Sequence, residues 1–395
     1  MIGRNAWWAP TLALAAACAE TTTGPGPGGD ADGGETNDIA AETPDDADDA
    51  RPDDAPPPEA ADDGGPNDVP DDGADAPDEG DAPCVPVGDT EACNGLDDNC
   101  DGTTDEGCAC ADGWVQEESG TTDLLLSIGG SGPDNVFVGG WGGLILRYDG
   151  ARWSRTDTGT TTEINGIWAH SPAFAVAVGG GGWILRWDGS RWTRMTSDTT
   201  AQLMAVWGSG PDNIFATGSS STIVRYDGST WRRMVHGLTI PGIFGVWGAS
   251  ATDVFVVGMR GGIGRYDGTT WTAMDSGTTG HLTGVWGSSP SNVFAVGDLG
   301  TIRHYRGAGS WLLMSPGTLQ YLTGIWGSGP DNVIVSAGGT TILRYDGGAW
   351  YQLPDLLPPG IGAAFRAVWG SSYTNVFAVG DNGIILHHCG RWWGW

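Results

Sequence analysis

Short apolar runs separated by turn-forming residues fill the chain from residue 114 onward. Residues 203–234, for example, read LMAVWGSGPDNIFATGSSSTIVRYDGSTWRRM and contain four such runs. Val, Ile, Phe and Trp favour strands, and the Gly, Ser, Asp, Asn and Pro between the runs favour tight turns. Helical periodicity is missing throughout this region. The pattern therefore predicts four short antiparallel β-strands joined by hairpins.

The four-run unit repeats along the chain, and a tryptophan in its first run marks six of the copies. This tryptophan is found at Trp168, Trp207, Trp247, Trp286, Trp326 and Trp369. Gly129 holds the equivalent place in SIGGSGPDNVF, so there are seven units at spacings of 39 to 43 residues. A period near 40 residues with four strands per copy is typical of propeller blades. We therefore predict an all-β fold, a seven-bladed β-propeller with four antiparallel strands in each blade.

The beginning of the repeat region predicts how the ring closes. CADGWVQEESGTT matches DGTTWTAMDSGTT when Trp114 is aligned with Trp271. The segment is then a lone fourth strand, so residues 114–120 are expected to complete the last blade and join the two ends of the ring. The terminal RWWGW, residues 391–395, competes for the same outer position.

Two cysteines fall where this closure leaves a hairpin turn missing. Cys110 aligns with Asp267, and Cys389 holds the same place in the last unit. We predict a Cys110–Cys389 disulfide that replaces the covalent turn. Closing a loop of about 280 residues stabilises a protein by roughly 5 kcal/mol in the chain-entropy model. The propeller is assigned to residues 110–395.

Negative charge is concentrated in the first part of the chain. Residues 1–112 hold 30 Asp or Glu against Arg4 and Arg51, whereas residues 113–395 hold 19 acids and 16 Arg. Residues 18–83 are Asp, Ala, Pro and Gly with almost nothing to bury, and this composition predicts a disordered acidic tether. Neither part offers the basic surface that phosphate binding needs, so nucleic acid is not an expected partner.

The first residues resemble a bacterial lipoprotein signal. MIGRNAWWAPTLALAAACAE has one Arg, a short apolar run and small residues that end at Cys18. The run is too short to span a bilayer but suits an export signal. The resemblance implies cleavage after residue 17, a lipid on Cys18 and an outer-membrane or cell-surface location, with the lipid as the only membrane contact. The family prefers Leu three residues before the cysteine, whereas Leu14 lies four before it, so plain secretion and an uncleaved anchor remain alternatives.

A cysteine-rich segment, residues 84–109, contains a candidate metal loop. DDNCDGTTDE fits the hard-cation pattern D-x-[DN]-x-[DN]-G, although Cys108 stands where an EF-hand has its bidentate Glu. The full CNGLDDNCDGTTDEGC resembles the MopE-type metal-binding motif of secreted proteins. Oxygen ligands favour Ca²⁺ over soft metals. The expected calcium ligands are Asp97, Asn99, Asp101, Thr103, Asp105 and Glu106.

The remaining cysteines leave the pairing in this segment open. Four are left once Cys18 is assigned to lipid and Cys110 to Cys389, and they allow three pairings: Cys84, Cys93, Cys100 and Cys108. An exported protein favours disulfides among them. A disulfide knot without metal and a thiolate metal site are the alternatives to calcium.

A YDGxxW turn ends the third run of most units. It is found at Asp149/Trp153, Asp188/Trp192, Asp227/Trp231, Asp267/Trp271 and Asp346/Trp350. The turn resembles the Asp-box of BNR-type propellers, which include sialidases and photosystem assembly factors, although the box has one residue between Asp and Gly. The longer pattern is similar to BNR-like repeats of secreted bacterial lipoproteins. The resemblance covers about 280 residues and implies the fold, with an Asp turn between the third and fourth strands of each blade.

Catalytic constellations are not recognisable in the repeats. A glycosidase needs two opposed carboxylates, but the propeller has only Glu117, Glu118 and Glu163, and most of its Asp residues are turn residues. One arginine per blade precedes the turn, and such residues cannot converge as a substrate clamp: Arg147, Arg186, Arg225, Arg265 and Arg344. We therefore expect a protein that is not an enzyme. A glycoside hydrolase or lyase acting on envelope glycans is the alternative.

Three tryptophans depart from the repeat and are candidates for stacking on a sugar ring: Trp141, Trp183 and Trp187. The expected function is a binding or scaffolding module of the cell envelope, monomeric, whose partner is a protein or a glycan at one propeller face. A structural role in an outer-surface assembly is a third hypothesis.

Overall fold

The computed structural model describes residues 113–307, 309–353, 357–358 and 361–390. These residues form seven separate four-stranded antiparallel sheets, which we number as blades 1 to 7. The predicted seven-bladed β-propeller is therefore confirmed. None of the helices in these ranges is long and apolar enough to cross a membrane.

The strands of each blade follow one another from the central axis to the rim. Blade 1 comprises β2 (Leu125–Gly132), β3 (Asn135–Gly140), β4 (Ile145–Tyr148) and β5 (Trp153–Thr156), and blade 2 comprises β6 (Ile164–Ser171), β7 (Phe174–Gly179), β8 (Ile184–Trp187) and β9 (Trp192–Met195). Blade 3 comprises β10 (Leu203–Gly210), β11 (Asn213–Gly218), β12 (Thr222–Tyr226) and β13 (Trp231–Arg233), and blade 4 comprises β14 (Ile243–Ser250), β15 (Asp253–Gly258), β16 (Ile263–Tyr266) and β17 (Trp271–Met274). Blade 5 comprises β18 (Leu282–Ser289), β19 (Asn292–Gly297), β20 (Ile302–Tyr305) and β21 (Trp311–Met314), and blade 6 comprises β22 (Leu322–Gly329), β23 (Asn332–Ala337), β24 (Thr341–Tyr345) and β25 (Trp350–Gln352). Blade 7 comprises β26 (Phe365–Ser372), β27 (Asn375–Gly380), β28 (Ile385–Cys389) and β1 (Gly113–Glu117).

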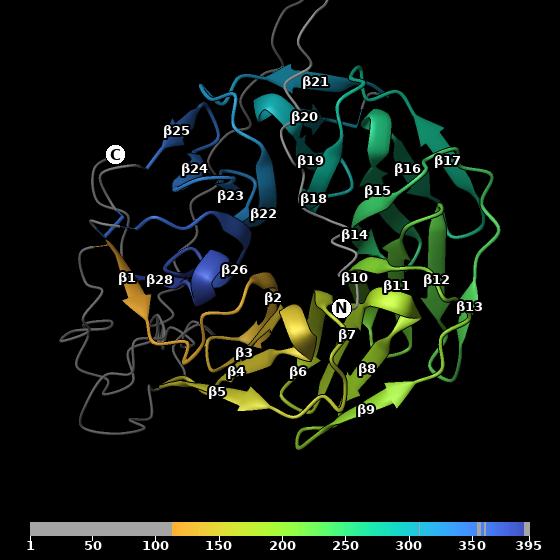
Figure 1. Cartoon of the computed structure of the whole chain (residues 1–395). Helices are drawn as coiled ribbons and strands as arrows, with labels where there is room; N and C mark the ends of the chain where they lie inside the picture. The colour runs from red at the N-terminus through yellow and green to blue at the C-terminus, as the bar shows by residue number, and fades with distance from the viewer. Residues whose placement is uncertain (1–112, 308, 354–356, 359–360, 391–395) are drawn as a thin grey trace, which may run out of the picture. The chain divides into compact units, whose positions relative to one another are not determined.

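The seven inner strands surround the central axis (Figure 1). Each inner strand packs against the inner strand of the next blade, and β26 packs against β2. The ring is therefore closed, and each blade has a neighbour on both faces of its sheet.

β1 closes the ring in the predicted way. It pairs antiparallel with β28, and Trp114 lies opposite His388. The N-terminal strand thus fills the outer position of blade 7. Its predicted competitor, residues 391–395, lies outside the described residues.

Strand alternation builds the core between the blades. Along β7, Ala175 and Ala177 face blade 1, whereas Val176 and Val178 face blade 3, because successive side chains of a strand point to opposite faces. The same arrangement in every blade gives seven apolar clusters, one at each interface between neighbours. Burial of both sheet faces explains why the second runs, such as NVFAVG, are apolar at almost every position.

The tryptophan that marks the repeat links each inner strand to the next. A Cβ atom on Gly208 would lie 2.7 Å from the Trp168 ring of the preceding blade, so glycine is required beneath the ring. The same contact recurs at five further interfaces. Blade 1 carries Gly129 in place of this tryptophan, and Ala169 of blade 2 replaces the facing glycine. The two departures from the repeat therefore compensate each other.

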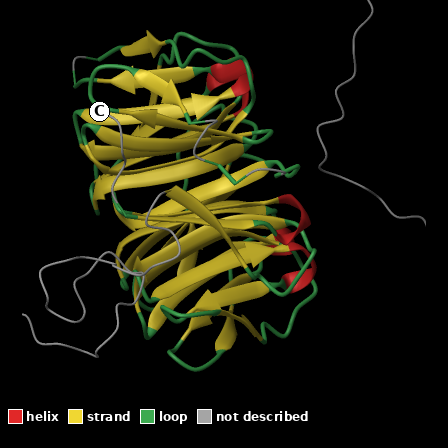
Figure 2. Ribbon diagram, turned by 90° about the vertical axis from the view of Figure 1, so that its left-hand side faces the viewer, coloured by secondary structure: helices red, strands yellow, loops and turns green. Residues whose placement is uncertain are grey.

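The strand order defines two faces of the ring. Turns between first and second strands and between third and fourth strands emerge together on what we call the turn face, because strands alternate in direction. Second-to-third connections and the links between blades emerge on the opposite side, the loop face. Among the described residues, five short 3₁₀ turns lie on the loop face: η1 (Trp141–Gly143), η2 (Gly180–Gly182), η3 (Met259–Gly261), η4 (Asp298–Gly300) and η6 (Asp381–Gly383). Figure 2 shows them in red along one side of the ring.

Candidate functional site

Most of the predicted site residues lie outside the described residues. This holds for the lipidation site, the calcium ligands and six of the seven cysteines: Cys18, Cys84, Cys93, Asp97, Asn99, Cys100, Asp101, Thr103, Asp105, Glu106, Cys108 and Cys110. Cys389 is described. It ends β28, is buried, and lies opposite Gly113 in the β1–β28 pair. Among the residues that the structure describes, no three His, Cys, Asp or Glu side chains gather as a metal site.

The three candidate stacking tryptophans have different environments. Trp141 opens η1 on the loop face and is 50% exposed. Trp183 is partly buried, and the guanidinium of Arg194 lies 3.9 Å from the centre of its ring. Trp187 is 4% exposed and takes the place of the repeat tyrosine, with its indole N–H donating to the Pro172 carbonyl. Its burial leaves no free ring face, so only Trp141 and Trp183 retain the character expected of surface aromatics.

The repeated arginines have a structural role within the blades. Arg225 donates from Nε to the Asn213 Oδ1 atom at 2.7 Å and lies over the Phe215 ring. Arg265 forms a bidentate ion pair with Asp253 in the same way. Each of these arginines joins the third strand of a blade to its second strand, which is the structural role that repetition indicated.

The repeated aspartates hold the turns between the third and fourth strands. Asp227 accepts hydrogen bonds from the backbone N–H groups of Ser229 and Thr230. These backbone bonds and the Ser229 hydroxyl lower the pKa of Asp227 below its ordinary value. The Asp turn therefore lies between the third and fourth strands, as the Asp-box resemblance implied. The carboxylates of these aspartates therefore serve to form the turns.

Two positions on the loop face around the central opening differ widely between blades. The residue before each inner strand is Leu124, Glu163, Gln202, Gly242, His281, Tyr321 and Ala364 in turn, and the second residue of each inner strand is Leu126, Asn165, Met204, Phe244, Thr283, Thr323 and Arg366. Repeat positions that serve only the fold mostly keep one residue type, as the turn aspartate does in five of the seven blades. The residues that distinguish one blade from another therefore surround the central opening on the loop face. We call this region the loop-face mouth.

Hydrogen bonds fix several polar side chains of the loop-face mouth. Gln202 donates from Nε2 to the Glu163 Oε1 atom at 3.1 Å, which joins blades 2 and 3. The backbone N–H of His281 donates to the Asp298 Oδ2 atom at 2.8 Å. The His281 ring in turn contacts Phe244 edge-on at 6.3 Å. The mouth is thus a preformed mixture of acids, amides and aromatic rings.

An ion pair and a tyrosine complete the mouth on the side of blades 6 and 7. Arg366 donates to both carboxylate oxygens of Asp381, at 2.8 and 3.2 Å. Desolvation raises the pKa of Tyr321 to about 12; the charge of Asp298 adds to the rise, and Arg366 opposes it. Tyr321 is therefore a neutral hydrogen-bond donor between charged neighbours at physiological pH.

Exposed apolar side chains border this tyrosine. Leu299 in η4 is 75% exposed, and Leu319 in the link from blade 5 to blade 6 is 80% exposed. The Gly300 N–H donates to the Gln320 carbonyl at 2.7 Å, so these two segments lie side by side. We call Leu299, Leu319 and Tyr321 the loop-face patch. Sequence patterns did not single out these residues, although Leu299 stands where blades 2 and 7 have Gly181 and Asn382.

Comparison with known proteins shows the fold. No protein-family model matches the chain, and neither does any curated protein sequence. Among solved structures it is similar to YCF48 bound to D1 peptide, with a TM-score of 0.60 and 16% identity over 70% of this chain and 97% of that one. YCF48 from Cyanidioschyzon merolae gives a TM-score of 0.59 at 16% identity over 70% and 98% of the chains. The WD40 repeats of RRP9 give 0.61 at 9% identity over 70% and 97%. This chain shares a propeller architecture with them.

Proposed function

We propose that the protein is an exported, lipid-anchored scaffold of the cell envelope whose loop-face mouth binds a protein partner. The observation that carries this proposal is the contrast between the two faces: the Asp turns repeat, whereas the loop-face mouth differs from blade to blade and carries the exposed loop-face patch. Exposed apolar residues beside polar groups are typical of protein interaction surfaces. Binding of D1 peptide by YCF48, a propeller of similar fold, is compatible with this use.

A binding role suits the acids of the propeller better than a catalytic one. Glu117 contacts His387 in the ring closure, and Glu163 accepts the Gln202 amide. Asp381 is neutralised by Arg366, and Asp298 holds the His281 backbone. None of these side chains offers the pair of opposed carboxylates that glycoside hydrolysis requires.

Site-specific photocrosslinking tests the proposed binding face. A benzophenone side chain at Leu319, on the loop-face patch, is expected to capture one envelope protein in intact cells. The same group at Tyr373, which is exposed in a first-to-second-strand turn on the turn face, is the matched control. Equal capture from both positions, or capture only from Tyr373, would contradict the assignment to the loop face.

The envelope features form the second part of the proposal. We infer a diacylglyceryl group on Cys18, a tether over residues 18–83 and a calcium loop over residues 93–108. A Cys110–Cys389 disulfide is supported by the position of β1, because its first residue, Gly113, lies opposite Cys389 and follows Cys110 by three residues.

Mass spectrometry and limited proteolysis check these features together. The mature N-terminal peptide is expected to begin at a lipid-modified Cys18, and non-reducing digests should link the Cys110 and Cys389 peptides. Millimolar Ca²⁺, rather than Mg²⁺, should slow cleavage within residues 93–108, since exposed extracellular sites bind calcium with a Kd of roughly 10⁻⁴ to 10⁻³ M. An unmodified Cys18 would contradict the lipid anchor, and a cleavage rate that does not change with Ca²⁺ would contradict the calcium loop.

A further inference from the structure

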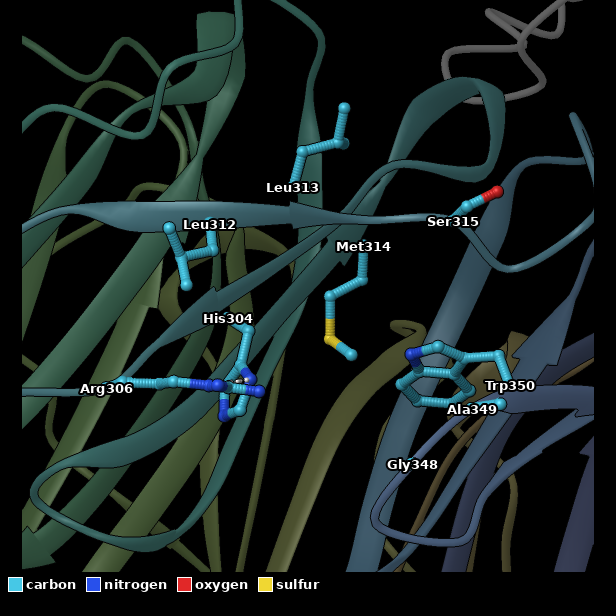
Figure 3. A pocket seen from close by; sticks show the side chains of 9 residues that line it. All are labelled: His304, Arg306, Leu312, Leu313, Met314, Ser315, Gly348, Ala349 and Trp350. Atoms are coloured by element: carbon cyan, nitrogen blue, oxygen red, sulfur yellow. Dashed lines mark hydrogen bonds between the residues drawn. The ribbon is translucent and has the colours of Figure 1, made fainter.

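A cavity of about 340 Å³ lies between the outer parts of blades 5 and 6, away from the loop-face mouth. Its walls come from the end of β20, from β21 and from the turn that leads into β25. Figure 3 shows Leu312 and Met314 pointing into the space, with Arg306 and His304 on one side and Trp350 on the other. Leu313 also belongs to the lining, although its side chain lies on the other side of β21 from those of Leu312 and Met314.

The repeat is broken at four positions that gather at this cavity. His304 replaces an arginine that five other blades carry, and Arg306 replaces the turn aspartate of the same five blades. The adjacent leucines, Leu312 and Leu313, occupy positions that are polar, small or a single valine in the outer strands of all the other blades. Blade 7 also has a histidine, His387, at the His304 position. The fold does not demand Arg306, Leu312 or Leu313, since the other blades form without them. Their clustering at one cavity indicates a binding role.

His304 holds the guanidinium of Arg306 at the cavity. Arg306 donates from Nε to the His304 Nδ1 atom at 3.2 Å, so Nε2 carries the ring hydrogen and donates to the Asn292 Oδ1 atom at 2.5 Å. The imidazole stacks on Phe294 with ring centres 4.0 Å apart. Burial, followed by the charge of Arg306, lowers the pKa of His304 to about 4. The histidine is therefore neutral at physiological pH and able to accept this hydrogen bond.

Arg306 is an exposed cation. No acidic side chain of the described ranges lies within ion-pair distance of it, whereas Arg152 and Arg191 in the equivalent turns face Asp149 and Asp188. Its Nε is committed to His304, which leaves the two terminal NH₂ groups for a ligand. A guanidinium presents these groups in the geometry that matches a carboxylate.

The strand beside Arg306 offers an unprotected edge. β21 is the outermost strand of blade 5, and its outer edge pairs with no described strand. Charged side chains protect such edges from added strands, and Arg155, Arg194 and Arg232 supply charge in blades 1 to 3. β21 instead exposes Leu312 (48%) and Leu313 (67%). The edge therefore combines free backbone groups with an apolar surface.

We propose that this cavity, the β21–Arg306 groove, binds an extended peptide segment that carries a carboxylate next to one bulky apolar side chain. The peptide backbone pairs with the outer edge of β21, the apolar side chain enters the space beside Leu312 and Met314, and the carboxylate binds Arg306. This is strand addition, a recurring mode of peptide recognition. The cavity volume is near the lower end of ligand pockets, which suits one side chain better than a long acyl chain. The groove goes beyond the loop-face function, because it lies on another part of the ring.

Peptide selection on the full-length chain tests the groove. Random dodecapeptides displayed on phage are expected to yield sequences with Asp or Glu within two residues of Leu, Ile, Met or Phe. A synthetic copy of the enriched sequence, measured by fluorescence anisotropy, should bind R306D about tenfold or more weakly, because a charge-assisted contact becomes a repulsion. The double variant L312T/L313A should weaken binding similarly. Both variants restore residues that other blades carry, since Thr272 and Ala273 hold the leucine positions in blade 4, so the fold is expected to persist.

R191D is the matched control, because it places the same charge change in the equivalent turn of blade 2 and should alter affinity less than about twofold. Unchanged melting curves for all variants exclude a general loss of structure.

Enriched peptides without acidic residues, a failure to enrich any peptide, or equal affinity for R306D and the unmodified chain would overturn the proposal. Binding to phosphatidylglycerol vesicles is measured separately. Vesicle binding that requires Arg306, in the absence of peptide binding, would also overturn the proposal. Loss of crosslinking at Leu319 would leave the groove unaffected, so the two proposals fail separately.

Discussion

Trp114→Ala is expected to lower the free energy of unfolding by about 3–5 kcal/mol, the usual cost of truncating a large buried aromatic residue. Trp114 is 4% exposed and packs in the cluster between blades 6 and 7 with Val376 and Leu386. It lies on β1, the one strand of blade 7 that comes from the other end of the repeat region. Its loss therefore weakens both the local core and the closure of the ring.

Urea unfolding followed by tryptophan fluorescence measures this effect. Gln116→Ala is the matched control, because Gln116 lies on the same strand with its side chain exposed, and it should change stability by less than about 0.5 kcal/mol. Truncations extend the test. A chain that starts at residue 113 lacks Cys110 but keeps β1, whereas one that starts at residue 118 lacks both, so their difference isolates the strand. Equal unfolding midpoints for these two truncations would show that β1 is not needed for closure.

Acidification is expected to destabilise the same blade through His388. Burial, followed by the charge of His387, lowers the pKa of His388 from 6.5 to about 3. The unfolded chain then binds a proton more tightly than the folded chain, so stability is full above pH 6.5 and falls as the pH decreases toward 3. Each unit of pKa difference is worth about 1.4 kcal/mol, and the whole interval therefore gives a loss of at most about 5 kcal/mol.

His388→Tyr isolates this contribution. Six other blades carry Tyr or Trp at the equivalent position, where Tyr148 and Tyr226 each pack against the tryptophan of the outer strand. The variant should therefore fold and should lose less stability between pH 6.5 and 4 than the unmodified chain. The measurement is the urea midpoint at several pH values. Identical pH dependence in the two proteins would show that His388 does not titrate as its burial implies.

Much of the fold could be predicted from sequence because each of the seven repeats shows the same strand and turn pattern independently. The alignment of Trp114 with Trp271 placed a lone strand at the beginning, and the structure pairs that strand with β28. The close approach of Gly129 to the Ile167 backbone of blade 2 was not foreseen, since it arises only when neighbouring blades stack.

The site was less predictable than the fold. Trp187 was singled out because it breaks the repeat, but the structure uses it as a core residue in place of tyrosine. Leu299 and Leu319 were not singled out, because an isolated exposed leucine looks like any other loop residue in a sequence. Arg306 was not singled out either, because a single departure from the turn aspartate has no evident role until its partner His304 and its apolar neighbours are seen around one cavity.

The sequence by itself determined the number of blades and the four strands in each, and it offered residues 114–120 as the closing strand with residues 391–395 as the competitor. It could do so because alternation, turn residues and repeat spacing are local properties, and each was present several times. Only the tertiary structure decided which face varies and which exposed side chains gather. Those properties depend on residues from different blades meeting in space, and the inter-blade packing that brings them together has no counterpart in the linear order of the chain.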